Sequence, residues 1–514
     1  MQWLVNIRLV NDEPTTPTST GPETAPESAP DPSDTLVRRS HTLTTATGPI
    51  RYTSESGTVV LRADELKDDV WRGRKPVAEV AVTAYTLDDA DPRERPVTFA
   101  FNGGPGSSSL WLHMGLLGPR RVEMGDAGDL LPPPYDLVDN PETLLATSDL
   151  VFIDPVSTGL SRVVSGGKPK DFHGFTADIE SVGEVIRTWV TRENRWLSPK
   201  FVAGESYGTT RAAAMAQHLQ EKLGMYLNGL MMISSVLDFG TANFEHGNDR
   251  AHALYLPFYA ATAHFHGQHG DRPLREVLDE AEEYAARDYP WALSRGNRLT
   301  DAERAEAVTR LAGLTGLSED YVDRADLRIE HWRFFGELLR ERGMTVGRLD
   351  SRFTGLAASR IAENMDADPA MDAITGPYSA TFQHYLGAEL GVTSEQVFHA
   401  ISEDVGRDWS FKEFENSAVY VIDRLARAMR QNPHLSVHFA YGYYDGATPY
   451  FCAMDDVARL APALLPRLEH HFYESGHMTY VHQPTRVQQS ADLAEFVLRH
   501  SGHAQRESST AEQA

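Results

Sequence analysis

Apolar and polar residues alternate along residues 41–103, with turn signals at Gly57 and at residues 88–92. This period of two predicts consecutive antiparallel strands, including strands at residues 77–87 and 97–101. Further along the chain, short apolar runs alternate with helical stretches, at residues 150–153, 178–192, 201–203, 209–223 and 230–233. Such an alternation is typical of a buried, mostly parallel sheet with flanking helices.

The strand pattern stops in the middle of the chain and then returns. The middle stretch is rich in Ala, Leu, Glu and Arg at helical spacing, and it predicts helices at residues 273–287, 301–314 and 327–342. Strand signals reappear at residues 435–441 and 468–473. We therefore expect the sheet to close after an inserted helical domain.

These changes of pattern divide the chain into five parts. We expect an α/β core, a helical cap inserted into it and two disordered polar tails. The predicted parts are a tail at residues 1–36, the first part of the core at 37–239, the cap at 240–385, the second part of the core at 386–500 and a tail at 501–514.

Composition narrows the class of protein. The chain has 73 acidic and 48 basic residues, and its net charge of -25 argues against nucleic acid or an anionic membrane surface as a partner. No apolar run approaches the roughly 18–20 residues that a membrane helix needs. The first ten residues lack the pattern of a signal peptide, and a strand pattern follows the Arg38-Arg39 pair in place of an export signal's apolar segment. We therefore expect a cytoplasmic protein.

The most specific local pattern is Gly204-Glu205-Ser206-Tyr207-Gly208. A G-x-S-x-G pattern arises by chance about 0.2 times in a chain of this length, so it is weak on its own. Here it follows an apolar strand and precedes a strong helix, which is the context of a nucleophile elbow. The pattern predicts Ser206 as a nucleophile.

A serine nucleophile needs a base and an acid that orients the base. Asp445 follows the predicted strand at residues 435–441, and His477 follows the next one, so both lie in loops at strand ends. Their order after Ser206 is that of an α/β-hydrolase triad. His470, His471 and His482 are set aside because they lie within the strand or beyond the loop. The alternative for Asp445 is an Asx turn before Gly446.

A glycine-rich loop, NGGPGSSS at residues 102–109, follows the predicted strand at residues 97–101. It lacks the G-K-[ST] ending of a phosphate-binding loop, and the acidic chain around it is a poor phosphate site. Exposed backbone N–H groups beside an elbow suit an oxyanion hole, with the N–H of Tyr207 as the second donor.

Five segments together resemble the serine carboxypeptidase family, peptidase family S10: FNGGPGSSSL, IDPVSTGLS, GESYG, YGYYDGATPY and SGHMTYVHQP. They occur in the family's order between about residues 100 and 485. The resemblance implies an α/β-hydrolase fold with an inserted helical cap and the triad Ser206, Asp445 and His477. It also implies an oxyanion hole at the N–H groups of Gly104 and Tyr207, and no cofactor.

The resemblance further implies a site for the free C-terminal carboxylate of a peptide, at Asn102, Gly103 and Glu205. Typical members have a Trp where this chain has Ala100 and a Glu where it has Leu116, so the network around that carboxylate is thinner here. Ser107 stands where a cysteine is common. Together with the single cysteine, Cys452, this resembles the disulfide-poor bacterial branch.

We therefore expect a hydrolase that removes C-terminal residues from peptides through an acyl-enzyme. The alternatives are an esterase or acyltransferase on the same scaffold, because fold and triad do not fix the acyl donor, and a catalytically silent binding protein that uses the cap cleft. A metal-like cluster of side chains, HFHGQHGD, is expected to be a polar cap loop, since triad hydrolysis needs no metal. Its members are His264, His266, His269 and Asp271. No metal site is expected.

Overall fold

The computed structural model describes residues 32–502. Of the predicted tails at residues 1–36 and 501–514, residues 1–31 and 503–514 lie outside the described residues, and Thr35 and Leu36 belong to a strand instead. Within residues 32–502 the chain forms a ten-stranded sheet, in which β8 (Arg162–Val163) pairs only with β3. The other strands, in spatial order, are β1 (Thr35–Thr45), β2 (Gly48–Lys67), β3 (Val70–Leu87), β7 (Asp149–Ile153), β4 (Val97–Phe101), β9 (Lys200–Ser206), β10 (Gly229–Ser235), β13 (Ser436–Gly442) and β14 (Leu468–Tyr473).

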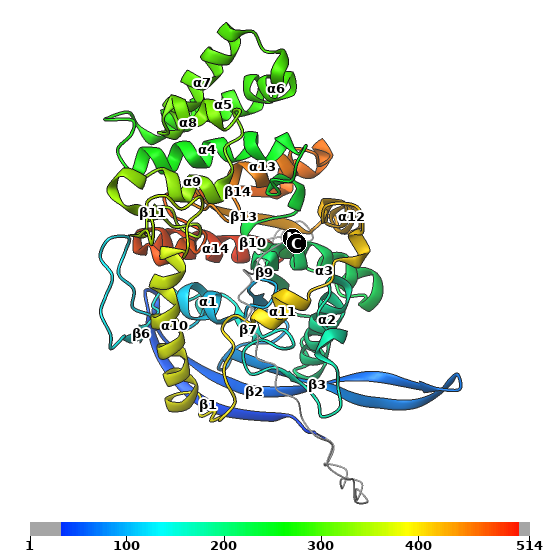
Figure 1. The fold of residues 1–514 in the computed structure, drawn as a ribbon. Coiled ribbons are helices and arrows are strands. Elements are labelled where there is room, and N and C mark those ends of the chain that lie inside the picture. Colours follow the sequence, from blue (N-terminus) through cyan, green and yellow to red (C-terminus); the bar gives the residue numbers. More distant parts are fainter. Residues whose placement is uncertain (1–31, 503–514) are drawn as a thin grey trace, which may run out of the picture.

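The sheet is mostly parallel, as the sequence predicted. Strands β7, β4, β9, β10, β13 and β14 run parallel to one another, and β1 to β3 are antiparallel. Five of the six parallel strands are buried along their whole length except for the last residue of β9, which explains their unbroken apolar runs. The β2–β3 hairpin extends well beyond the body of the molecule (Figure 1).

Helices cover both faces of the sheet, and each face has its own apolar core (Figure 1). On one face lie α2 (Phe175–Arg192), α3 (Tyr207–Leu223) and α12 (Ile422–Gln431). On the other face lie α1 (Leu110–Leu112), α10 (Pro369–Ala388) and α14 (Gln483–His500). This is the predicted α/β architecture with flanking helices.

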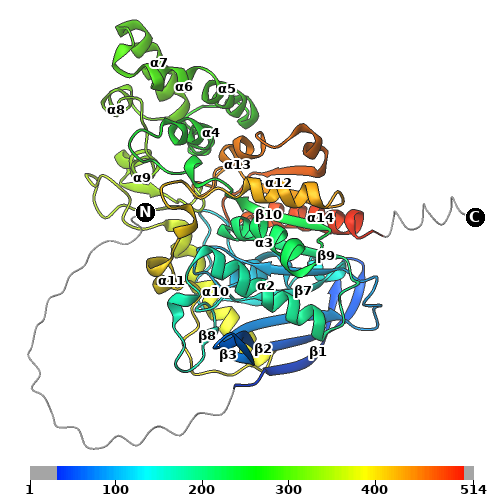
Figure 2. The same ribbon diagram turned by 90° about the vertical axis from the view of Figure 1, so that its right-hand side faces the viewer.

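A separate helical layer stands above the end of the sheet formed by β13 and β14 (Figures 1 and 2). It has a third apolar core of its own, to which Cys452 of α13 (Tyr450–Val457) contributes. Its helices are α4 (Asp249–Phe265), α5 (Leu274–Ala286), α6 (Asp288–Arg295), α7 (Asp301–Thr315), α8 (Glu319–Arg324) and α9 (His331–Glu337). Helices α5 and α7 correspond to the predicted helices at residues 273–287 and 301–314.

The end of the inserted region differs from a simple helical cap. The helix predicted at residues 327–342 is shorter, because α9 ends at Glu337 and a small hairpin of β11 (Met344–Val346) and β12 (Thr354–Leu356) follows. Helix α10 packs on the core beside α1 and β5 (Arg120–Val122), where the rings of Tyr378 and Trp111 are 5.2 Å apart. Within residues 32–502 no helix is long and apolar enough to cross a membrane.

The carboxyl ends of the parallel strands lie along one edge, where α/β sheets bind ligands. β4 leads into the glycine-rich loop, and β9 leads into the predicted elbow. β13 and β14 lead into the loops of Asp445 and His477. The topology therefore gathers all the predicted site residues at this edge.

A buried charge cluster fixes the opposite, amino-terminal end of β7. Asp149 is 2% exposed. Its carboxylate accepts hydrogen bonds from Arg195 Nη1 at 2.5 Å, from Arg95 Nε at 3.1 Å and from the backbone N–H of Leu87 at 3.0 Å. Both guanidinium groups are themselves largely buried. One carboxylate thus compensates two desolvated cations.

Replacing Asp149 with Asn should lower the free energy of unfolding by about 3–5 kcal/mol, because two buried cations lose their counter-charge. Calorimetric melting measures the effect. The control is Asp279→Asn on α5, whose exposed carboxylate pairs with Arg275, and this change should stay within about 1 kcal/mol. Equal melting temperatures for the wild type and Asp149→Asn would contradict the role given to this cluster.

Candidate active site

Ser206 lies at a sharp turn between β9 and α3, as the elbow pattern predicted. Its backbone has φ 60° and ψ -130°, a strained region for a residue with a side chain. Its neighbours Glu205 and Tyr207 are buried, whereas Ser206 is partly exposed. The turn therefore presents the serine side chain to the edge of the sheet.

The glycine-rich loop lies directly against the backbone of this turn. A Cβ atom added to Gly103 would be 2.5 Å from the nitrogen of Tyr207 and 2.7 Å from the carbonyl oxygen of Glu205. A Cβ atom on Gly204 would lie 2.3 Å from the oxygen of Gly208. Only glycine allows these approaches. The loop segment that carries Gly104 is thereby held beside the N–H of Tyr207. The N–H groups of Gly104 and Tyr207 are the two predicted oxyanion donors.

Two buried ionic side chains brace this loop. Arg211 on α3 donates from Nη1 to the carbonyl oxygen of Asn102 at 2.7 Å and from Nε to Asp178 at 2.7 Å. Asp154, in the IDPVSTGLS motif, accepts hydrogen bonds from the N–H and the hydroxyl of Ser109 at 2.8 and 2.7 Å. Sequence reasoning assigned no role to Arg211 or Asp154. A signal was available for each: Asp154 stands in the IDPVSTGLS motif, and Arg211 is a charged residue in an apolar stretch of its helix.

Asp445 and His477 are in direct contact. His477 Nδ1 lies 2.8 Å from Asp445 Oδ2, and both side chains are buried. The other carboxylate oxygen of Asp445 accepts the backbone N–H groups of Ala447 and Thr448 at 2.8 and 2.9 Å. The Thr448 hydroxyl adds a hydrogen bond to Asp445 Oδ2 at 2.7 Å. Because Nδ1 faces the carboxylate, Nε2 is the ring nitrogen left for a reaction partner.

Asp445 and His477 each stabilise the charged form of the other. Burial alone raises the pKa of Asp445, but the adjacent His477 and the hydrogen bonds from Thr448 outweigh it and hold that pKa below its ordinary value. Burial lowers the pKa of His477, but the carboxylate of Asp445 outweighs burial, and the net result is a raised pKa. The arrangement favours an ionised acid beside an imidazole that can carry positive charge.

The histidine loop contacts both β10 and the elbow. Ser234, at the end of β10, donates its hydroxyl proton to the carbonyl oxygen of His477 at 2.5 Å. Tyr480, three residues after His477, donates to Glu205 Oε2 at 2.6 Å, next to Ser206. Within residues 32–502 no hydrogen bond joins the Ser206 hydroxyl to His477, and such bonds often form only when substrate is bound.

Glu205 is buried beneath the elbow with a partner on each oxygen. Asn102 Nδ2 donates to Oε1 at 2.8 Å, and the Tyr480 hydroxyl donates to Oε2. Burial raises the pKa of Glu205 from 4.5 to about 7, against the opposing effects of His477, Tyr480 and Asn102. Glu205 is thus an acid that changes protonation near neutral pH. Tyr480 is a second residue of this network that sequence reasoning missed, although it stands in the SGHMTYVHQP motif.

The two departures from the family pattern lie in the apolar core. Ala100 and Leu116 are fully buried among the hydrophobic residues on the α14 side of the sheet. Neither position contributes a polar group to Glu205 or Asn102. Among the described residues, the side chains of Asn102 and Tyr480 are those that hydrogen-bond to the carboxyl group of Glu205.

The histidines set aside by sequence reasoning have other contacts. His264, His266 and His269 each place Nε2 within hydrogen-bond distance of a backbone carbonyl oxygen, at 2.7, 2.8 and 3.0 Å. His470 contacts the Tyr441 hydroxyl at 3.1 Å. A cavity of about 760 Å³ lies in the helical layer, and none of the predicted catalytic residues lines it.

The fold and the elbow define the class of this protein as an α/β hydrolase. Residues 84–253 match the model of the serine carboxypeptidase family, Peptidase_S10. Serine carboxypeptidase-like 2 from Arabidopsis thaliana is 28% identical over 182 residues, which are 34% of this chain and 36% of the relative. Serine carboxypeptidase-like 5 from the same plant is 30% identical over 151 residues, 28% of this chain and 32% of the relative.

The matched region thus spans about a third of the length of these curated relatives. The matches confirm the predicted resemblance to the serine carboxypeptidase family. Among solved structures, a proline iminopeptidase from Mycobacterium smegmatis is 16% identical with a TM-score of 0.35, covering 87% of this chain and 99% of that chain. A likeness at this TM-score adds nothing to the fold, which rests on the strand order described above.

The pKa of Glu205 predicts a pH-dependent difference in stability. A carboxyl group with a raised folded-state pKa stabilises the fold at acidic pH, and this contribution is lost as pH rises from about 4.5 through about 7. Glu205→Gln removes the loss, so relative to the wild type the variant should gain roughly 3 kcal/mol between pH 5 and pH 8. Melting curves across this range measure it.

The control is Glu283→Gln, the same carboxyl-to-amide change at a largely exposed position on α5. A stability difference between Glu205→Gln and the wild type that stays constant from pH 5 to pH 8 would show that Glu205 does not titrate in this range.

Proposed function

We propose that this protein is a serine carboxypeptidase that removes C-terminal residues from peptides. Ser206 Oγ attacks the carbonyl carbon of the last peptide bond, and His477 Nε2 takes its proton. His477 then gives that proton to the leaving amino group as the C–N bond breaks. Water hydrolyses the resulting acyl ester by the same route in reverse and restores Ser206.

The proposed roles follow from the contacts of each residue. The contact between Asp445 and His477 supports Asp445 as the group that fixes the imidazole tautomer and stabilises its positive charge. The N–H groups of Gly104 and Tyr207 stabilise the oxyanion, because the glycine-rich loop lies against the elbow. No step requires a metal ion or an organic cofactor.

The observation that carries the proposal is a buried, protonatable carboxyl group beside the nucleophile. Asn102 and Glu205 are hydrogen-bonded to each other directly behind Ser206. Two carboxyl groups in hydrogen-bond contact cannot both be ionised, so a neutral Glu205 suits a peptide whose terminal carboxylate is ionised. Asn102 and the N–H of Gly103 complete the site for that carboxylate in this proposal.

A specific observation favours a second candidate, an esterase or acyltransferase on the same scaffold. Ala100 and Leu116 place buried apolar side chains where the resemblance leads us to expect Trp and Glu. A thinner carboxylate site weakens selection for free C-termini. The triad and the oxyanion donors serve both candidates, so only the substrate separates them.

Incubation with a mixture of peptides, followed by mass spectrometry, tests the proposal. We expect products shortened stepwise from the C-terminus and a loss of about 10⁴-fold or more in Ser206→Ala, because the triad acts as a unit. Ser235→Ala is the control, since its buried hydroxyl has no hydrogen-bond partner in the described chain. Near-normal turnover by Ser206→Ala, or internal cleavage only, would contradict the proposal.

The protonation of Glu205 predicts how substrate binding depends on pH. For peptides with a free C-terminus, KM should rise from pH 5 to pH 8 as Glu205 loses its proton near pH 7. Glu205→Gln keeps a donor at every pH and should flatten this rise, while ester hydrolysis is largely spared.

The same peptides capped as C-terminal amides provide the comparison. They should bind poorly at pH 5 and show little rise in KM. If KM for free-acid peptides is flat across this range, or amides are cleaved equally well, the proposed carboxylate site does not exist. The esterase or acyltransferase then becomes the favoured function.

A further inference from the structure

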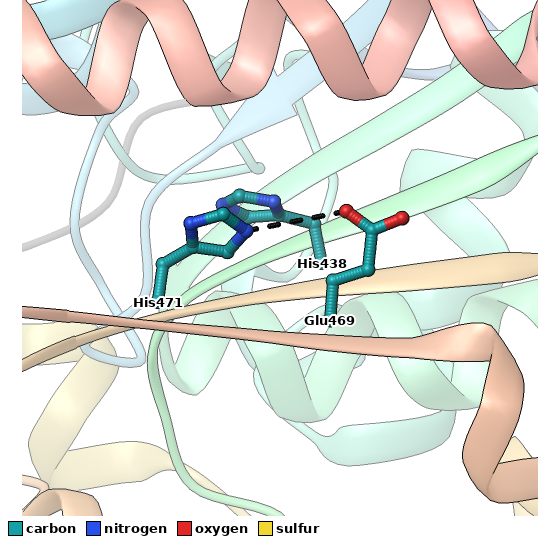
Figure 3. A group of neighbouring side chains, drawn as sticks. All are labelled: His438, Glu469 and His471. Atoms are coloured by element: carbon teal, nitrogen blue, oxygen red, sulfur yellow. Dashed lines mark ion pairs between the residues drawn. The ribbon is translucent and has the colours of Figure 1, made fainter.

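Three side chains of metal-binding types meet at the edge of the sheet, away from the proposed active site (Figure 3). His438 lies on β13, and Glu469 and His471 lie on β14. His438 is paired with Glu469, and His471 is two residues further along β14, so all three side chains point to the face covered by α14. One ligand atom from each lies within 4.8 Å of the others.

His438 is the least explained member of this group. Its side chain is fully buried, and in the described chain neither ring nitrogen has a hydrogen-bond partner. Buried polar groups in folded proteins are almost always partnered, so this ring calls for a ligand.

His471 is oriented for a ligand on its other nitrogen. Its Nδ1 lies 3.3 Å from Asp492 Oδ2 on α14, and its Nε2 lies 4.0 Å from Glu469 Oε2. A metal-binding histidine typically donates its second N–H to a carboxylate, which fixes the tautomer. Asp492 lies on the Nδ1 side of the His471 ring, and Glu469 lies on its Nε2 side.

Glu469 is held as a carboxylate by two residues at the end of α14. Arg499 Nη2 lies 2.7 Å from Oε2, and His500 Nε2 lies 3.1 Å from Oε1. The group thus combines two imidazole rings with an ionised oxygen ligand.

We propose that His438, Glu469 and His471 bind a Zn²⁺ ion. Two imidazole nitrogens and a carboxylate oxygen are a common ligand set for Zn²⁺, with a water molecule as the fourth ligand. Tetrahedral Zn²⁺ needs ligand atoms about 3.3 Å apart. One ligand atom of each residue lies within 4.8 Å of the others, and the rings of His438 and His471 are stacked with centroids 4.3 Å apart. Binding of the ion therefore requires the two rings to turn out of this stack, so that both nitrogens face the metal.

The ion would join the last two strands of the sheet. β14 is the edge strand, and its only strand partner in the described chain is β13. These two strands also lead into the loops of Asp445 and His477. The proposed site does not depend on the reaction proposed for Ser206.

Zinc content tests the proposal directly. The full-length protein is treated with a chelator, dialysed against Zn²⁺ and analysed for bound metal by mass spectrometry. We expect about one Zn²⁺ per chain in the wild type, and a loss of at least tenfold in affinity in His438→Gln and His471→Gln. His470→Gln is the matched control. The His470 ring stacks on Phe439 on the opposite face of the sheet, so this variant should bind Zn²⁺ as the wild type does.

A second measurement uses the wild type alone, so that it does not depend on the folding of a variant. At a Zn²⁺ concentration of 100 times Kd, the melting temperature should rise by about 3 °C relative to the metal-free protein. A wild type that binds no Zn²⁺ at 100 times the protein concentration, or His438→Gln that binds as the wild type does, overturns the proposal.

Discussion

No side chain fits between the loop that follows β4 and the turn that follows β9. Gly103 lies against the backbone of residues 205 and 207, and Gly204 lies against Gly208. This contact between two backbones fixes where the proposed oxyanion donors lie relative to Glu205 and Ser206. Arg211 and Asp154 reinforce it from beneath, and Asn102 extends it to Glu205. The proposed chemistry depends on this close packing.

The inserted region also holds the loops of Asp445 and His477 in place. The carbonyl oxygen of Leu349 accepts the N–H of His477 at 2.6 Å, and that of Arg348 accepts the N–H of Gly446 at 2.9 Å. Asp350 is buried against Gly476, whose added Cβ would lie 2.4 Å from that of Asp350. Residues 348–350 therefore connect the loops of Asp445 and His477. An insertion that only covered the site would make no such contacts.

Local patterns were enough to predict the strands, the elbow and the loops of Asp445 and His477, because each of these features depends on residues close in sequence. The catalytic roles of these residues stay predictions. The packing of α10 on the core was not predicted, since its helical pattern does not say which partner buries its apolar face. Tyr480 was missed because its contact with Glu205 joins segments 275 residues apart.

The group of His438, Glu469 and His471 shows the same limit of sequence reasoning. The two histidines are 33 positions apart in the sequence, and only the register of β13 against β14 places them on one face. The cluster with metal-like spacing in the sequence, at residues 264–271, instead spreads its imidazole rings over separate backbone carbonyl groups. Spacing along the chain is a poor guide where the ligands come from neighbouring strands.

The central claim is that the strained turn presents Ser206 as a nucleophile activated by His477. A fluorophosphonate probe forms a covalent bond only with an activated serine, and peptide mapping by mass spectrometry locates the adduct. The account predicts one adduct per chain, on Ser206, and its loss in His477→Ala. An unlabelled wild-type protein, or an adduct on another serine, would contradict the account.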